Sequence, residues 1–158
     1  MALLACLPTG SSTPLLLATG VGEGTTLESA NGLLYARVNG NWVSIDGQGH
    51  VATNSAPPPG RTTTGPGGAT CPSMGGHAAP RATATDHGGR TFVACASDEE
   101  GRAGAGDYVY RVDGDAPLLV GARAGTVVAM SFGSGGLLAP QNLYLLQSGG
   151  SIVYLRPP

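Results

Sequence analysis

The sequence contains no lysine and few charges of any kind. All eight basic residues are arginines, charged residues make up 11% of the 158 residues, and the formal net charge is −2. The arginines are scattered, at Arg37, Arg61, Arg81, Arg90, Arg102, Arg111, Arg123 and Arg156. A nucleic-acid-binding protein would show a basic patch or stripe, so we expect no nucleic-acid partner. Arginine, alanine, glycine and proline in place of lysine and isoleucine indicate a GC-rich, bacterial genome.

Long apolar runs are also missing. No stretch reaches the roughly 18 apolar residues that a membrane helix needs, so no membrane span is expected. The first ten residues, "MALLACLPTG", are apolar, but they are few and no basic residue precedes them. They are therefore not typical of a signal peptide, and we interpret residues 1–12 as a disordered or clipped segment. The compartment stays open: cytoplasmic, or extracytoplasmic if the N-terminus is truncated.

Cysteine is scarce, and its arrangement is not that of a metal or redox motif. Cys6, Cys71 and Cys95 make an odd number with no CxxC pair. Cys71 and Cys95 could form a disulfide in an oxidising compartment. Three free thiols is the interpretation that we favour.

Histidines do not stand in any metal-binding pattern. His50, His77 and His87 lack zinc-ligand spacing, and no HExxH or GxSxG motif occurs. Asp86 and His87 are adjacent in the turn "TDHGGR", which we interpret as a solvated turn pair. The functional alternative is a site at the mouth of a repeat unit.

One loop concentrates negative charge, in Asp98, Glu99, Glu100 and Asp107. Oxygen ligands of this kind bind Ca²⁺, but the DxDxDG pattern of a calcium loop is absent. We therefore expect a solvated loop, and we predict no catalytic residue, no metal site and no cofactor for the chain.

The clearest structural signal is the stretch "NGLLYARVNGNWVSIDGQG" at residues 31–49. Apolar and polar residues alternate up to Val38, which is the period of a half-buried strand. Asn39-Gly40 is a preferred pair for a type I′ turn, and a second β-prone run starts at Trp42. We predict a β-hairpin here.

The hairpin pattern recurs along the chain. "DYVYRVDGDAPLLVG" (107–121) and "NLYLLQSGGSIVYLR" (142–156) repeat it, and apolar runs at 15–20, 91–97 and 126–132 precede the hairpins. Gly40, Gly114 and Gly150 suggest one repeat register. A second register, with a period nearer 45 residues, aligns the segment that begins at residue 81 with the one that begins at 126. Both periods fall within the range of repeat proteins, and both registers remain open.

The middle of the chain has a different composition. Residues 55–80 are rich in Pro, Gly, Ser and Thr and contain almost no large apolar residue, so we expect a linker or long loop. The predicted organisation is therefore a first β-repeat at 13–54, this linker at 55–80, and two further β-repeats at 81–158.

These repeats resemble β-propeller blades. "TPLLLATG…NGLLYARVNGNWVSI" resembles the repeat of sialidase-like and photosystem-assembly-like propellers, where Leu34-Tyr35 match a Leu-Tyr pair and Asn39-Gly40 with Trp42 echo the Asp box. The Asp of that box is Asn39 here, and the spacing to Trp42 is shorter. "GTVVAMSFGSGG…NLYLLQSGGSIVYLR" is similar to SMP-30 and NHL-type blades. The resemblance implies an all-β fold of repeated antiparallel hairpins, with a β-trefoil as the alternative.

A closed propeller usually needs at least about four blades, and the sequence shows three repeats. We therefore expect a partial propeller, with a homo-oligomer that completes the ring as one possibility. Propellers host binding proteins and enzymes, so the fold alone does not decide the function. The prediction is a non-catalytic module that binds a protein or a glycan. The alternative is a fragment of a propeller hydrolase of the glycosidase or lactonase type.

Aromatic residues are the predicted binding residues, although aromatics make up only 5% of the chain. Those in the hairpins can stack on sugars or anchor a protein partner, while the structural alternative is packing between strands. The candidates are Tyr35, Trp42, Tyr108, Tyr110, Tyr144 and Tyr154.

Overall fold

Every regular element in the described part of the chain is a β-strand, so the all-β prediction is confirmed. The computed structural model describes residues 13–58, 71, 80–96, 106–113, 116–122 and 124–157. A helix that could span a membrane does not occur among these residues. The predicted segment 1–12 lies outside the described residues, as do most of the predicted linker and the acidic residues Asp98, Glu99 and Glu100.

Twelve strands occur in the described residues. They are β1 (Leu15–Ala18), β2 (Gly24–Ala30), β3 (Leu33–Val38), β4 (Asn41–Ile45), β5 (Val51–Ser55), β6 (Ala82–Thr85), β7 (Thr91–Cys95), β8 (Tyr108–Arg111), β9 (Leu118–Gly121), β10 (Val127–Phe132), β11 (Leu143–Gln147) and β12 (Ile152–Leu155).

The strands form three antiparallel sheets of four strands each. Sheet I has the order β2-β3-β4-β5, and sheet II has the order β6-β7-β8-β9. Sheet III has the order β1-β12-β11-β10, so its outer strand comes from the other end of the described chain. Leu15 of β1 lies opposite Tyr154 of β12 in this pairing. Sheets I and II are sequential meanders, whereas sheet III joins distant parts of the sequence.

The predicted hairpins are confirmed, and the structure selects between the two repeat registers. β3–β4, β8–β9 and β11–β12 are antiparallel neighbours at the three predicted places. β6 and β10 are edge strands at equivalent places in sheets II and III. They start at Ala82 and Val127, 45 residues apart, which matches the second register. Within the segment 13–54, β1 joins sheet III, while β2, which was not predicted, begins sheet I.

The turn chemistry of the first hairpin is as the sequence indicates. Asn39 has φ 51° and Gly40 has φ 81°, so both central residues of the β3–β4 turn are left-handed. Asn31 and Gly32 repeat this geometry between β2 and β3, with φ of 51° and 79°. Asn and Gly tolerate positive φ at low cost, which explains both tight reversals.

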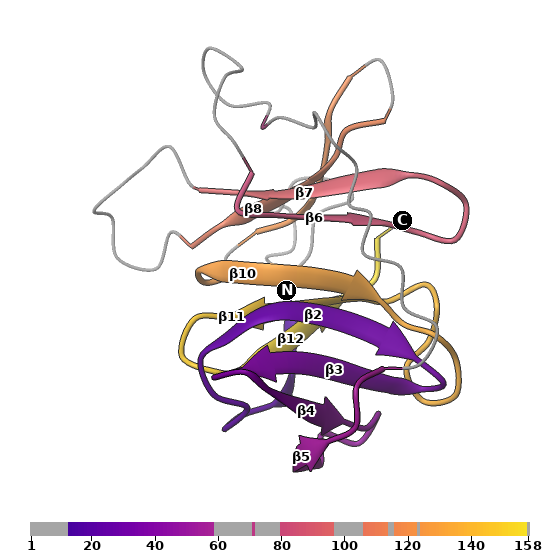
Figure 1. Cartoon of the computed structure of the whole chain (residues 1–158). Coiled ribbons are helices and arrows are strands. Elements are labelled where there is room, and N and C mark those ends of the chain that lie inside the picture. The colour runs from indigo at the N-terminus through magenta and orange to yellow at the C-terminus, as the bar shows by residue number, and fades with distance from the viewer. Residues whose placement is uncertain are drawn as a thin grey trace, which may run out of the picture.

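Sheet III lies between the other two sheets, because both of its faces are apolar. In β11, Leu143 and Leu145 pack toward Phe92 of sheet II, while Tyr144 and Leu146 belong to the cluster of sheet I. β10 contacts both β2 and β6, and Figure 1 shows it between them. The alternation of strand side chains thus gives one sheet two buried faces.

A buried carboxylate joins sheet II to sheet III. Asp107 is 3% exposed and accepts hydrogen bonds from Arg81 Nε at 3.1 Å and from the backbone N–H of Val127 at 2.9 Å. Asp107 was expected in a solvated loop, and the structure instead buries it at the start of β8. The charged partner and the backbone donor offset the desolvation of its carboxylate.

Cys71 and Cys95 form a disulfide, so the expectation of free thiols at these two positions is wrong. Their Cα atoms are 5.8 Å apart, and both residues are buried. The disulfide packs with Val93, Tyr110 and Val112 in a cluster separate from the two main cores. Through Cys71, it covalently joins the predicted linker at residues 55–80 to β7.

Candidate functional site

Three of the six candidate aromatic residues are buried. Tyr35 is 8% exposed, Trp42 is 6% exposed and Tyr144 is 2% exposed. The guanidinium carbon of Arg37 lies 5.1 Å from the ring centroid of Trp42, a cation–π contact on sheet I. The ring centroids of Tyr144 and Tyr154 are 5.6 Å apart, and burial raises the pKa of the Tyr144 hydroxyl. The three buried side chains contribute packing area.

Tyr108, Tyr110 and Tyr154 are half-buried and keep part of their surface exposed. Tyr108 and Tyr110 stand two residues apart on β8, so they share one face of sheet II, and their ring centroids are 6.4 Å apart. Across the ladder, Tyr110 pairs with Val93 and Tyr108 with Cys95. We call the surface of Tyr108 and Tyr110 the tyrosine face. It lies on the side of sheet II opposite to the core that it shares with sheet III.

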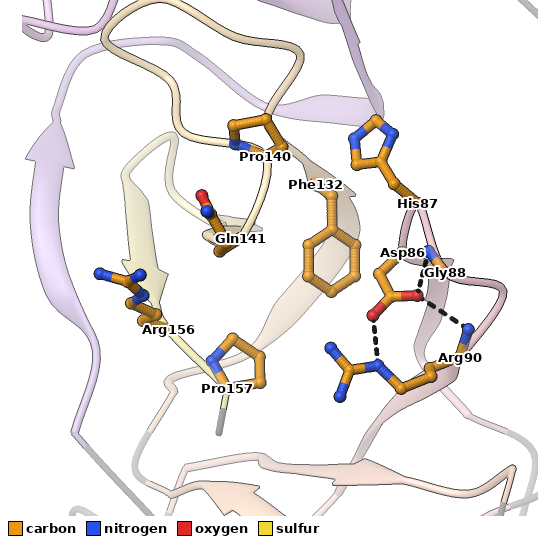
Figure 2. Close-up of a pocket in the computed structure, with 9 residues that line it drawn as sticks. All are labelled: Asp86, His87, Gly88, Arg90, Phe132, Pro140, Gln141, Arg156 and Pro157. Carbon is orange, nitrogen blue, oxygen red and sulfur yellow. Dashed lines mark hydrogen bonds and ion pairs between the residues drawn. The ribbon is translucent and has the colours of Figure 1, made fainter.

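A pocket of about 480 Å³ lies at the seam between sheets II and III (Figure 2). Sheet II contributes the turn between β6 and β7, and sheet III contributes the end of β10, the loop that follows it and the residues after β12. The lining residues are Asp86, His87, Gly88, Arg90, Phe132, Pro140, Gln141, Arg156 and Pro157.

The carboxylate of Asp86, the acidic residue of this pocket, is hydrogen-bonded within the β6–β7 turn. Asp86 Oδ1 accepts hydrogen bonds from the backbone N–H groups of Gly88 at 3.0 Å and Arg90 at 2.8 Å. Its Oδ2 accepts the Nε–H of Arg90 at 2.6 Å. Burial acts to raise the pKa of Asp86, but the hydrogen bonds and charge of Arg90 outweigh it and lower the pKa below 3.8. The carboxyl group is therefore ionised and paired at neutral pH.

The histidines are placed separately. His87 Nε2 donates to the carbonyl oxygen of Gly133 at 2.9 Å, which links the β6–β7 turn to the loop after β10. His50 lies in an exposed turn of sheet I, with Nδ1 2.9 Å from Asp46 Oδ2. His77 lies outside the described residues. Among the described residues, no three His, Cys, Asp or Glu side chains gather as metal ligands would.

The sequence pointed to part of this pocket and missed the rest. Asp86 and His87 stand in a recognisable turn, and a site at the mouth of a repeat unit was the functional alternative for them. The opposite wall, from Gln141 and Arg156, follows them by more than fifty residues and carries no motif. The packing of β10 of sheet III against β6 of sheet II brings the two walls together.

Comparisons with known proteins return no significant match. No protein-family model, no curated protein and no solved structure is similar to this chain at a significant level.

Proposed function

We propose that this chain is a propeller-like, non-catalytic module that binds a protein or carbohydrate ligand. Its sheets support the propeller-like arrangement, because each one is a four-stranded antiparallel unit and β10 contacts β2 and β6, the first strands of the neighbouring sheets. The pairing of β1 with β12 further ties the two ends of the described chain into one such unit. The described strands form separate sheets, which favours this arrangement over a trefoil.

The tyrosine face is the observation that carries the binding proposal. Tyr108 and Tyr110 present two half-exposed rings on one face of a strand. Val93 and the disulfide lie beside them on the same face, and Tyr110 packs against both. Aromatic rings held in this way provide a large contact area with little loss of side-chain freedom on binding. Such a surface suits the apolar face of a sugar or a protein side chain.

The state of the carboxylates supports binding rather than hydrolysis. Asp86 and Asp107 both accept several hydrogen bonds from groups of their own protein. A general acid or base needs a pKa near the working pH, and the pKa of Asp86 is shifted in the opposite direction from that of a general acid. We therefore assign these two residues structural roles.

Glycan-array binding and light scattering together test the proposal. The expected result is either retention of a glycan or a defined oligomer, and either property should be lost in the double variant Tyr108→Ala/Tyr110→Ala. Leu16→Ala is the matched control, because Leu16 is 62% exposed but lies on β1 of sheet III. A folded monomer that binds no glycan, or equal behaviour of the tyrosine variant and the control, would overturn the proposal.

A further inference from the structure

The pocket between sheets II and III has two walls in different hydrogen-bonding states. On the sheet II wall, the Asp86 carboxylate already accepts three hydrogen bonds, two of them from Arg90. A carboxylate has about four acceptor positions, so little capacity remains for hydroxyl groups of a ligand. The side chains of this wall have no net charge, because Asp86 and Arg90 form an ion pair.

The opposite wall has unused donors. Within the described part of the chain, neither the Gln141 amide nor the Arg156 guanidinium makes a hydrogen bond or an ion pair. Both residues are exposed. Figure 2 shows the Arg156 guanidinium directed away from Phe132, so a change of rotamer of this exposed side chain brings it over the pocket opening. A guanidinium offers five N–H donors and no acceptor, and its planar fork matches a carboxylate. The charged side chains among the lining residues are therefore Asp86, Arg90 and Arg156, and the charge that is not paired within the lining is that of Arg156.

Between the walls the lining is apolar. Figure 2 shows the Phe132 ring between the Asp86–Arg90 pair and the Gln141–Arg156 wall, with Pro157 beside it. Pro140 adds a second proline ring at the edge. Apolar ring surfaces at this position favour a ligand with a flat apolar body, since its burial removes apolar area from water.

We propose that this pocket binds a small organic carboxylate with an apolar ring, whose carboxylate pairs with Arg156 and Gln141 and whose ring packs against Phe132 and Pro157. The scarcity of free acceptors disfavours a ligand rich in hydroxyl groups, and the apolar lining disfavours a bare inorganic anion. The site is separate from the tyrosine face and does not depend on the function proposed for that face.

Amide NMR of the ¹⁵N-labelled full chain tests the site with three probes. Benzoate carries both required features, benzamide has the same ring without the charge, and inorganic phosphate has charge without a ring. We expect benzoate to shift the signals of Gly88, Phe132, Gln141 and Arg156 in a saturable manner. Benzamide and phosphate should bind at least about tenfold more weakly, which is a difference that titration resolves readily.

Two variants with the same change of charge make the test specific. Arg156→Gln should weaken benzoate binding by about tenfold or more, because the charge-assisted hydrogen bonds are lost. Arg37→Gln on sheet I should leave the affinity unchanged, and since Arg156 is exposed, circular dichroism should show that both variants fold. Equal binding of benzoate and benzamide, equal binding of phosphate, shifts outside the pocket, or no effect of Arg156→Gln would each overturn the proposal.

Discussion

At the scale of single residues, Asp107 illustrates how one buried charge can be tolerated. Its carboxylate receives the guanidinium of Arg81 and the backbone N–H of Val127, while its own backbone N–H donates to Gly125 and its carbonyl accepts from Ala124. These bonds connect the starts of β6, β8 and β10. The residue therefore acts as a joint between sheets II and III.

Replacement of Asp107 by alanine should lower the free energy of unfolding by about 1–3 kcal/mol, because the buried backbone N–H of Val127 loses its acceptor and the partly exposed Arg81 loses its ion-pair partner. Urea unfolding followed by circular dichroism measures the loss. Asp113→Ala is the control, since Asp113 makes an ion pair with Arg111 at the surface, with an Nε–Oδ1 distance of 2.8 Å. Exposed pairs contribute little, so a loss for Asp113→Ala equal to that for Asp107→Ala would contradict the role assigned to burial.

Residue-level patterns predicted only part of the candidate site. Tyr108 and Tyr110 could be named from the sequence because they stand in an alternating run beside a turn. Alternation, however, does not say which row faces a core, so Tyr144 received the same prediction although it is buried between sheets. Gln141 and Arg156 have no local signal, because their position depends on contacts between distant segments.

At the scale of elements, turn residues carried most of the predictive information. Asn39-Gly40 and Gly149-Gly150 have positive φ, and each closes a hairpin where the sequence placed one. β2 was missed because "GTTLESA" has only Leu27 as a buried large apolar residue, so no alternation is visible. Its strand conformation comes from pairing with β3, in which Glu28 lies opposite Tyr35.

Two glycines with similar positive φ should differ in their tolerance of a side chain. Gly40 has φ 81° and open space where a Cβ atom would stand, so Gly40→Ala should cost about 1 kcal/mol from backbone strain alone. Gly150 has φ 91°, and a Cβ there would lie 2.5 Å from the backbone nitrogen of Gly22. Gly150→Ala should therefore cost more than about 2 kcal/mol, since close-packed backbone must move.

Chemical denaturation of the two variants compares these costs directly. The contact at Gly150 also includes a hydrogen bond, in which the backbone N–H of Val21 donates to the Gly150 carbonyl at 2.9 Å. Faster hydrogen exchange at Val21 in Gly150→Ala, with no change there in Gly40→Ala, would locate the damage at the junction of β1 and β12. Equal destabilisation by the two substitutions would show that the close approach to Gly22 has no energetic weight.

At the scale of the whole molecule, long-range pairing decided what the sequence could not. Leu15 and Tyr154 are at opposite ends of the described chain and still lie side by side in sheet III. Local periodicity cannot reveal such a pair, because the strand pattern of "LLLA" suits any neighbour. The sequence allowed a bond between Cys71 and Cys95 only as an alternative to free thiols, because a separation of 24 residues does not show whether the two side chains meet.

The disulfide should contribute substantially to the stability of sheet II. Cross-linking residues 24 positions apart removes loop-closure entropy from the unfolded chain, which amounts to about 3 kcal/mol. Full reduction by a dithiol should therefore shift urea unfolding to lower concentration by a matching amount. Cys71, Cys95 and Val93 form a cluster of their own, so hydrogen exchange should accelerate first in β7 and β8 and least in β3 and β11.

The double variant Cys71→Ala/Cys95→Ala controls for other effects of the reductant. Its stability should resemble that of the reduced protein and should not respond to the dithiol, since the target bond is absent. Mass spectrometry after alkylation confirms the reduction in the unsubstituted chain. If the reduced protein unfolded at the same urea concentration as the oxidised one, the packing of Cys71 against Val93 and Tyr110 would account for the stability without the bond. Acceleration of exchange in all three sheets would instead show that sheet II cannot loosen independently of the core it shares with sheet III.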